Sequence, residues 1–202
     1  MTVVNQYRTF VQTNNILPKH ISEISNDLNE YSTLQEIEKT IWKDYAANTL
    51  DQCVDDPAFG EYIAREKMLA YIFSLLQNMS QDEAQIHLQL SSPIALWTSP
   101  LLKDFKLEYF SFVKVLIEEG QERGEIQKRP FINKVYPDLF WVTLLSVLAF
   151  WSKDKSAHKE QTDVAVEKWV NLLFDTIAPN AIDSALDLAQ FMFKQNFNGN
   201  AK

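Results

Sequence analysis

Apolar residues recur every three or four positions along almost the whole chain, which is the spacing of a helix with one buried face. We therefore predict helices over Val3–Val11, His20–Leu28, a segment that begins at Thr33, Ala58–Met79, Ser80–Leu90, Leu101–Arg123, Pro137–Asp154, Lys159–Ile177 and Ala181–Phe197. Ser91–Pro100 contains two prolines and is predicted to be a loop. No segment shows the convincing alternation of a strand, so the pattern predicts an all-α fold.

Local signals support several of these helices. Thr33 and Glu36 form the T-x-x-E capping box that opens a helix. Gly124 follows the long helix and can take the left-handed conformation that ends it, which would return Ile126 to the core. Pro137–Asp154 is apolar on nearly every side, so it must be buried against the chain, a partner or a ligand.

Composition narrows the class of protein. The chain has 202 residues, of which 46% are hydrophobic and 23% charged, as in a globular protein with one compact unit or two small ones. Its single cysteine excludes a disulfide framework, and with no secretory signal at the N-terminus we expect a cytoplasmic protein. The net charge of −8 disfavours a general polyanion-binding surface. Leu139–Trp151 is shorter than the roughly 20 residues of a membrane span, so no stable membrane insertion is expected.

No catalytic signature is present. The three histidines, His20, His87 and His158, are far apart and have no second ligand at metal-binding spacing. The sequence contains no P-loop, dinucleotide fingerprint, nucleophile elbow or zinc-protease motif. We therefore expect a binding protein that is not an enzyme and that has no metal site and no cofactor.

The order of these parts resembles the TetR family of transcriptional regulators. The segment EEGQERGEI, residues 118–126, is similar to the end of the long helix in that family's C-terminal ligand domain. YSTLQEIEKTIWKDY, AREKMLAYIF and VYPDLFW further resemble a TetR-like group common in Bacteroidetes. The resemblance implies an N-terminal helix-turn-helix-like head over residues 1–50. It also implies a C-terminal helical domain over residues 51–202 that binds ligand and dimerises.

The head departs from the family pattern. His20–Leu28 matches the support helix and Leu34–Tyr45 the connecting helix, but only Asn29–Ser32 lies between them. These four residues span about 6 Å as a helix, too short for the recognition helix that enters the major groove. Residues 1–50 also carry a net charge of −2, whereas DNA affinity rests on Lys and Arg. Lys19 and His20 are the candidate phosphate contacts.

The resemblance assigns two roles to the C-terminal region. The late helices would form a homodimer, and the interface residues we select are Phe140, Leu144, Val147, Trp151, Ala165, Trp169, Leu172 and Thr176. The earlier helices would enclose a small hydrophobic ligand. The candidate pocket walls are aromatic residues that combine apolar area with, in most cases, a polar tip: Tyr71, Trp97, Tyr109, Phe112 and Trp141.

Three functions remain open at this point. The first is a regulator in which a hydrophobic effector shifts a dimer between DNA-competent and incompetent states. The second is a TetR-fold protein that does not read DNA and binds a lipid or isoprenoid. The third is a dimeric adaptor without a cavity. The closing helix Ala181–Phe197 has an apolar face that could dock on the body or on a partner.

Overall fold

The computed structural model describes residues 2–25, 30–90, 93–129 and 132–179. Within these ranges all regular structure is helical, which confirms the predicted all-α fold. The elements are α1 (Val3–Asn14), η1 (Ile21–Glu23), α2 (Leu34–Asp55), η2 (Phe59–Glu61), α3 (Ala64–Ser80), α4 (Glu83–Gln89), α5 (Pro93–Thr98), α6 (Leu102–Glu122), η3 (Asn133–Val135), α7 (Tyr136–Trp151), η4 (Ala157–Lys159) and α8 (Glu160–Ile177), where η marks a 3-10 helix.

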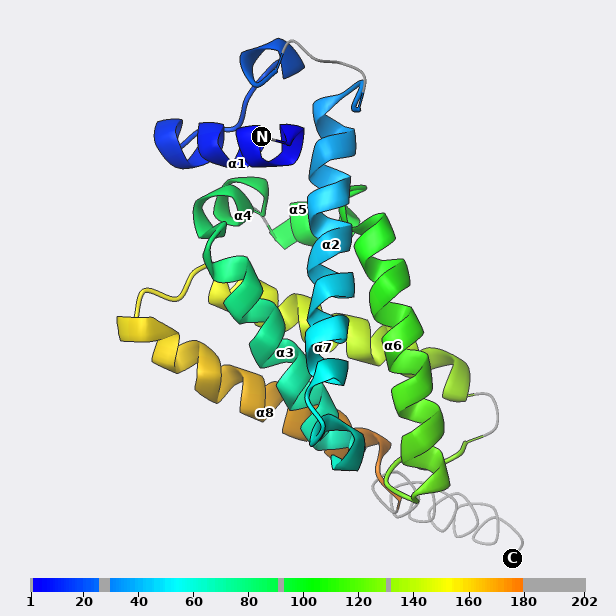
Figure 1. Ribbon diagram of the computed structural model, residues 1–202. Helices are drawn as coiled ribbons and strands as arrows, with labels where there is room; N and C mark the ends of the chain where they lie inside the picture. The colour runs from blue at the N-terminus through cyan, green and yellow to red at the C-terminus, as the bar shows by residue number, and fades with distance from the viewer. Residues whose placement is uncertain (1, 26–29, 91–92, 130–131, 180–202) are drawn as a thin grey trace, which may run out of the picture.

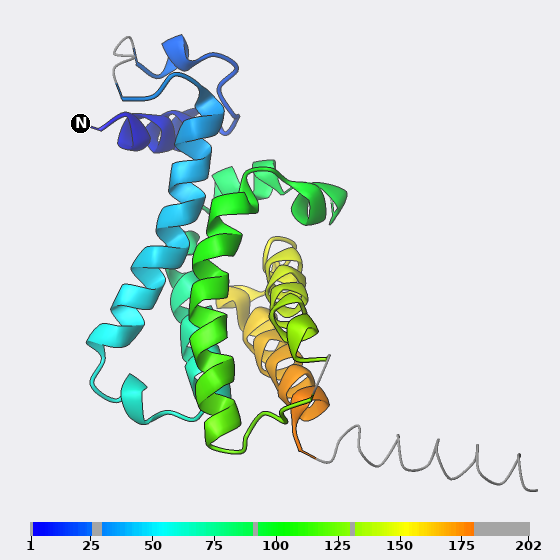
Figure 2. The ribbon, with the colours of Figure 1, turned by 90° about the vertical axis from the view of Figure 1, so that its right-hand side faces the viewer.

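The two longest helices, α2 and α6, lie side by side and form the spine of the molecule (Figures 1 and 2). α3 packs against both of them, and α8 packs on α3 and on α7. α1 lies across the N-terminal end of α2 and contacts α4 (Figure 1). We use "head segment" for residues 2–25 and "helical body" for residues 34–179.

The capping box predicted at the start of the third helix is confirmed. The Thr33 hydroxyl accepts the Glu36 backbone N–H at 3.2 Å, and the Glu36 carboxylate accepts the Thr33 N–H at the same distance. This reciprocal pair satisfies two backbone donors that a helix N-terminus otherwise leaves without partners. It fixes where α2 begins, and α2 then runs unbroken to Asp55, through the domain boundary expected at residue 50.

The turn between α7 and α8 is held by two charged side chains. The Asp154 carboxylate accepts the backbone N–H and the hydroxyl of Thr162, at 2.9 and 2.7 Å, and the Ser156 N–H at 2.8 Å. These hydrogen bonds lower the pKa of Asp154 well below its ordinary value. The Lys159 ammonium donates to the Asp154 carbonyl at 2.8 Å and to Glu83 on α4 at 2.6 Å. The turn is thereby tied to α4.

Two details of the predicted helices differ from the structure. In its described part, residues 20–25, the support helix expected over His20–Leu28 forms only the 3-10 turn Ile21–Glu23, and residues 26–29 lie outside the described ranges. The loop expected at Ser91–Pro100 contains a short helix, α5, because Pro93 occupies a helix start, where its missing N–H costs nothing. The closing helix expected over Ala181–Phe197 lies outside the described residues.

In the part of the chain that the structure describes, one stretch is long and apolar enough to cross a membrane by length and composition. It runs from Asn133 to Trp151, has a mean hydropathy of 1.2, and is 50% buried within the chain. Here it packs as the core helix that its all-round apolar pattern predicted, with α8 as its main neighbour.

Candidate functional site

The segment EEGQERGEI forms the joint that brings the end of α6 against the start of α3. Gly124 has φ +75°, the left-handed conformation predicted for it, and Ile126 returns to the core with 1% of its surface exposed. A Cβ added at Gly120 would lie 2.7 Å from the Ile126 Cδ1 atom, so this close return needs glycine. The Glu125 carboxylate then accepts the backbone N–H of Ala64 at 2.7 Å and caps α3.

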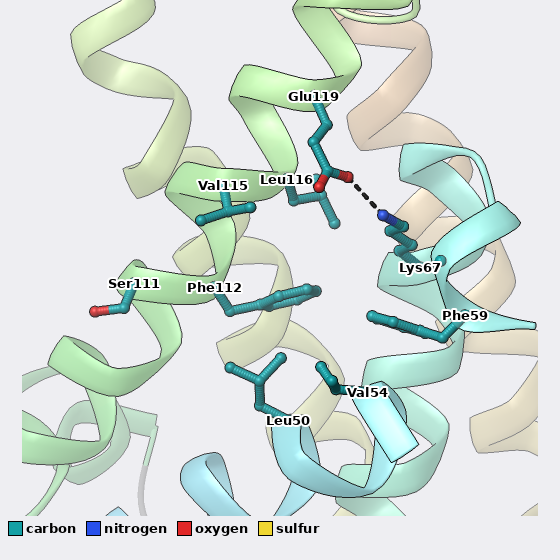
Figure 3. A pocket seen from close by; sticks show the side chains of 10 residues that line it. Leu50, Val54, Phe59, Lys67, Ser111, Phe112, Val115, Leu116 and Glu119 are labelled. Atoms are coloured by element: carbon teal, nitrogen blue, oxygen red, sulfur yellow. Dashed lines mark hydrogen bonds and ion pairs between the residues drawn. The ribbon is translucent and has the colours of Figure 1, made fainter. Parts of the chain in front are cut away.

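This joint sets the separation of the helices around a pocket of about 490 Å³ (Figure 3). Its walls come from the C-terminal part of α2, the η2 turn, α3 and α6. The lining residues are Leu50, Val54, Phe59, Gly60, Lys67, Ser111, Phe112, Val115, Leu116 and Glu119. The volume falls in the range of roughly 300–1,000 Å³ typical of small-molecule sites.

Apart from Ser111, the pocket is lined by apolar residues and Gly60 except at one end, where Lys67 of α3 meets Glu119 of α6. The Lys67 ammonium donates to the Glu119 carboxylate at 2.5 Å and lies 5.6 Å from the centre of the Phe59 ring. Only 9% of the Lys67 side chain is exposed, against 39% for Glu119. Figure 3 shows this ion pair above Phe59, with Phe112 facing across the cavity. The arrangement provides a long apolar surface that ends at a buried cation.

The predicted ligand-binding aromatic residues are only partly brought together. Tyr71, Tyr109, Phe112 and Trp141 form one cluster, in which the Tyr71 and Phe112 rings stack at 4.5 Å and Tyr109 lies 5.9 Å from Trp141. Of these, Phe112 lines the pocket and the other three pack behind it in the core. Trp97 lies on α5, is 49% exposed and does not line this pocket. Of the five residues, Phe112 is therefore the one that lines this pocket, and the ligand-binding set stays a prediction.

The two tyrosines behind Phe112 are buried as neutral groups. Burial raises the pKa of Tyr71 and Tyr109 well above the ordinary value of 10.0. The Tyr109 hydroxyl donates to the Phe140 carbonyl at 3.1 Å, which satisfies it inside the core. These rings therefore support the pocket floor, and a ligand in the pocket would contact Phe112 first.

The predicted dimer interface is divided between the inside and the outside of the chain. Phe140, Leu144, Val147 and Trp151 of α7 are at most 3% exposed and pack within the core of the chain, so the structure does not present them as a surface for a partner. On α8, Trp169, Leu172 and Thr176 are exposed and Ala165 is half-buried. Because α7 is apolar on nearly every side, its sequence pattern does not predict which of its faces is buried in the core.

An exposed apolar surface does run along α7 and α8, which we call the α7–α8 stripe. Its exposed large members are Val142, Phe150, Val164, Trp169 and Leu172. A groove of about 460 Å³ between the two helices is lined by Ser146, Ala149 and Phe150 of α7 and Trp169 of α8, and on its other side by polar and charged residues, namely Lys153, Asp154, Lys155 and Gln161. The stripe therefore joins both helices in one surface, and the small residues Ser146 and Ala149 allow another helix to approach closely.

The head segment places few cations where DNA could meet them. Lys19 and His20 are both exposed, in the connection between α1 and η1. Arg8 instead points to the helical body, where its Nε atom pairs with the Asp82 carboxylate at 2.9 Å. Described residues 30–33, which precede α2, contain no helix, so the expected place of a recognition helix is irregular there.

The polar end of the pocket was missed by the sequence reasoning, although one signal could have found it. Lys67 falls on the buried stripe of α3, between Ala64 and Tyr71, where a charged residue requires a partner. Nothing in the sequence points to Glu119 as that partner, because it belongs to another helix, 52 positions later. Among the described residues, no group of three or more His, Cys, Asp or Glu side chains is placed to hold a metal ion.

The structure is an all-helical body with a pocket between α2, α3 and α6, joined to an N-terminal helical segment by the long helix α2. The comparisons with known proteins agree with that architecture. A family model described as "Tetracyclin repressor-like, C-terminal domain" matches residues 67–192. The chain therefore belongs to the TetR family of regulators. No curated protein and no solved structure matches the chain.

Proposed function

We propose that this chain is a homodimeric, cytoplasmic TetR-family regulator whose body binds a small apolar effector in the pocket between α2, α3 and α6. The observation that carries the proposal is the position of α2. Leu50 and Val54 near its C-terminal end line the pocket, while Tyr7 of α1 packs at its N-terminal end, where the Tyr7 hydroxyl donates to Glu38 at 2.6 Å. A ligand that moves α2 would move the head segment with it.

The α7–α8 stripe supports the dimer. Trp169 lines a groove with the small residues Ser146 and Ala149 of α7, and Leu172 of α8 is also exposed. Monomeric soluble proteins rarely leave large contiguous apolar patches in water. A second copy placed with its own stripe against this one would form a four-helix contact, a closed and symmetric arrangement.

A second function, apolar-ligand binding without DNA reading, is favoured by the head segment. Described residues 30–33 are irregular, Arg8 is engaged by Asp82, and residues 1–50 have a net charge of −2. Since phosphate neutralisation supplies most DNA affinity, operator binding by this head should be weak. The two candidate functions share the pocket and the dimer, and they differ only in whether the protein binds operator DNA.

The pocket is tested by filling it. Val115→Trp places a large ring at the pocket mouth, since Val115 is exposed there on α6. Leu107→Trp is the matched control, because Leu107 is also exposed on α6 but does not line the pocket. Binding of the hydrophobic fluorophore 1,8-ANS by the folded protein is expected to fall at least tenfold in Val115→Trp and to stay unchanged in the control. Equal binding by both variants would contradict the proposed site.

Dimerisation and DNA binding need separate measurements. Leu172→Glu is expected to convert a dimer to a monomer in sedimentation equilibrium, because it places a charge in the centre of an apolar contact, whereas Leu107→Glu should leave the dimer intact.

DNA binding is measured at low salt with the region upstream of the chain's own coding sequence. A specific complex would favour the regulator, and its absence would favour the ligand-binding protein that does not read DNA.

A further inference from the structure

The two charged residues of the pocket are not equivalent, and their difference indicates which kind of ligand fits. Lys67 is held from several sides: its side chain is 9% exposed, it lies over the Phe59 ring, and it rises from the buried stripe of α3. Glu119 lies at the end of α6 with 39% of its side chain exposed. Glu119 can therefore turn to water, while Lys67 cannot leave the pocket.

A cation fixed in an apolar wall must keep an anionic partner. Leaving a buried ammonium without a counter-ion in such surroundings costs far more free energy than returning an exposed carboxylate to water. The partner of Lys67 is consequently exchangeable, provided that the incoming group is also an anion. A ligand with a neutral head group would leave the Lys67–Glu119 ion pair in place. A ligand with a cationic head group would be repelled by the Lys67 ammonium.

We propose that the ligand of this pocket is a small apolar carboxylic acid whose carboxylate replaces that of Glu119 at the Lys67 Nζ atom. Its hydrocarbon part lies along Leu50, Val54, Phe112 and Val115, the apolar lining opposite the ion pair. The exchange is non-covalent, and Glu119 is released to solvent. This inference rests on the proposed effector pocket and adds the chemical class of the effector.

The proposal is tested with three probes of equal chain length: decanoate, 1-decanol and decylamine, each titrated into the full chain by isothermal calorimetry. We expect decanoate to bind at least tenfold more tightly than decanol, and decylamine to bind least. Extending decanoate by one methylene is expected to raise the affinity by up to about fourfold while the chain still fits, from the transfer free energy of a buried methylene.

Variants of the Lys67–Glu119 ion pair identify the residue that is responsible for the preference for decanoate. Lys67→Met keeps the apolar stem and is expected to abolish the preference for decanoate over decanol, whereas Lys67→Arg should retain it. Glu119→Gln removes the competing carboxylate and should tighten decanoate binding several-fold. Lys43→Met is the control, because Lys43 is exposed on α2, pairs with Glu108 at 3.6 Å and does not line the pocket. Circular dichroism establishes that each variant is folded.

The outcomes separate this inference from the proposed function. Equal binding of decanoate and decanol, or tightest binding of decylamine, would overturn the carboxylate proposal and leave the apolar pocket standing. Unchanged preference in folded Lys67→Met would also overturn it. Failure of all three probes, together with unchanged 1,8-ANS binding in Val115→Trp, would overturn the pocket itself.

Discussion

The helical body and the head segment are held in place by different kinds of contact. In the body, α6 and α7 bury a continuous cluster of aromatic and aliphatic side chains, among them Phe105 and Phe140, each with 0% of its surface exposed. α1 buries Val3, Tyr7 and Val11, packs half-buried Val4 and Phe10 against the core, and adds polar contacts with α2, Asp82 and α4. Apolar burial in the body is non-directional and contributes a large free energy of folding. The polar contacts of α1 are directional and contribute a smaller one.

Two residues of the α3–α4 region each link the head segment to α2. Asp82 accepts a hydrogen bond from the Tyr45 hydroxyl at 2.5 Å and pairs with Arg8. Gln89 accepts from the Trp42 indole N–H at 3.0 Å and donates to the Tyr7 hydroxyl at 3.3 Å. A few directional bonds can be broken without unfolding the core, so the head segment can change position while the body stays folded.

The largest expected effect lies in the body core. Phe105 contacts Trp42 at 5.6 Å and Trp141 at 5.9 Å, measured between ring centres, so Phe105→Ala leaves a cavity among rings. We expect a loss of about 3–5 kcal/mol in the free energy of unfolding. The same change at half-buried Phe10 on α1 should cost about 1 kcal/mol. Urea unfolding followed by circular dichroism at one fixed protein concentration compares the two, and equal losses would contradict the distinction between the regions.

A smaller effect is expected where the head segment meets the body. Arg8→Met removes the cation beside Asp82, whose side chain is 2% exposed, and leaves that carboxylate with Tyr45 alone. We expect a loss of about 1–3 kcal/mol. Lys43→Met breaks an exposed pair and should cost less than about 0.5 kcal/mol. In hydrogen exchange, the amides of α1 should lose protection in Arg8→Met while those of α6 do not. Uniform loss across both helices would show that the head segment is not a separate unit.

The glycine that ends α6 should show an effect of about 1 kcal/mol. Gly124 has φ +75°, a conformation that an L side chain adopts only with strain, so Gly124→Ala is expected to destabilise the body by about 1–2 kcal/mol. Gly60→Ala is the matched control, since its φ is not positive and a Cβ there meets no atom within 4 Å. Thermal unfolding of both variants measures the difference, and a Gly124→Ala protein as stable as Gly60→Ala would refute this account of the joint.

The smallest effect is a pH dependence in the α7–α8 turn. The hydrogen bonds from Thr162 and Ser156 lower the pKa of Asp154, so its contribution to stability is complete above the unfolded pKa of about 4 and is lost as the pH falls toward the folded pKa. Asp154→Ala should therefore lower the melting temperature at pH 6, and the gap to the wild type should narrow below pH 4. Glu167→Ala, an exposed change on α8, should show little gap at either pH. A gap for Asp154→Ala that stays constant down to pH 2.5 would contradict this role.

The order of the main helices and several of their ends could be predicted, because those signals are local. The Thr33–Glu36 capping box and the left-handed Gly124 depend on residues within a few positions of each other. The predicted support helix is the opposite case, because its described residues 20–25 form only the 3-10 turn Ile21–Glu23. Helical spacing over a short segment is weak evidence for a helix when little apolar surface is buried.

The candidate site was less predictable. Lys67 on a buried stripe signals that a partner is needed, but the partner Glu119 and the opposing wall of Leu50 and Val54 come from other helices. The aromatic residues chosen for the pocket are the large amphipathic residues of the region, and most of them fill the core instead. Type and spacing of residues do not distinguish a ring that faces a cavity from a ring that faces another ring.

The sequence by itself determined the all-helical fold, the family, the joint at residues 118–126 and the acidic character of residues 1–50. These follow from periodicity, composition and local backbone preferences, which act between near neighbours in the chain. Only the tertiary structure decided that Phe140 and Leu144 turn inward, that Trp169 and Leu172 remain exposed, and that Lys67 ends an apolar pocket. A helix that is apolar all round can bury any face, so the choice is made by the helices that pack against it.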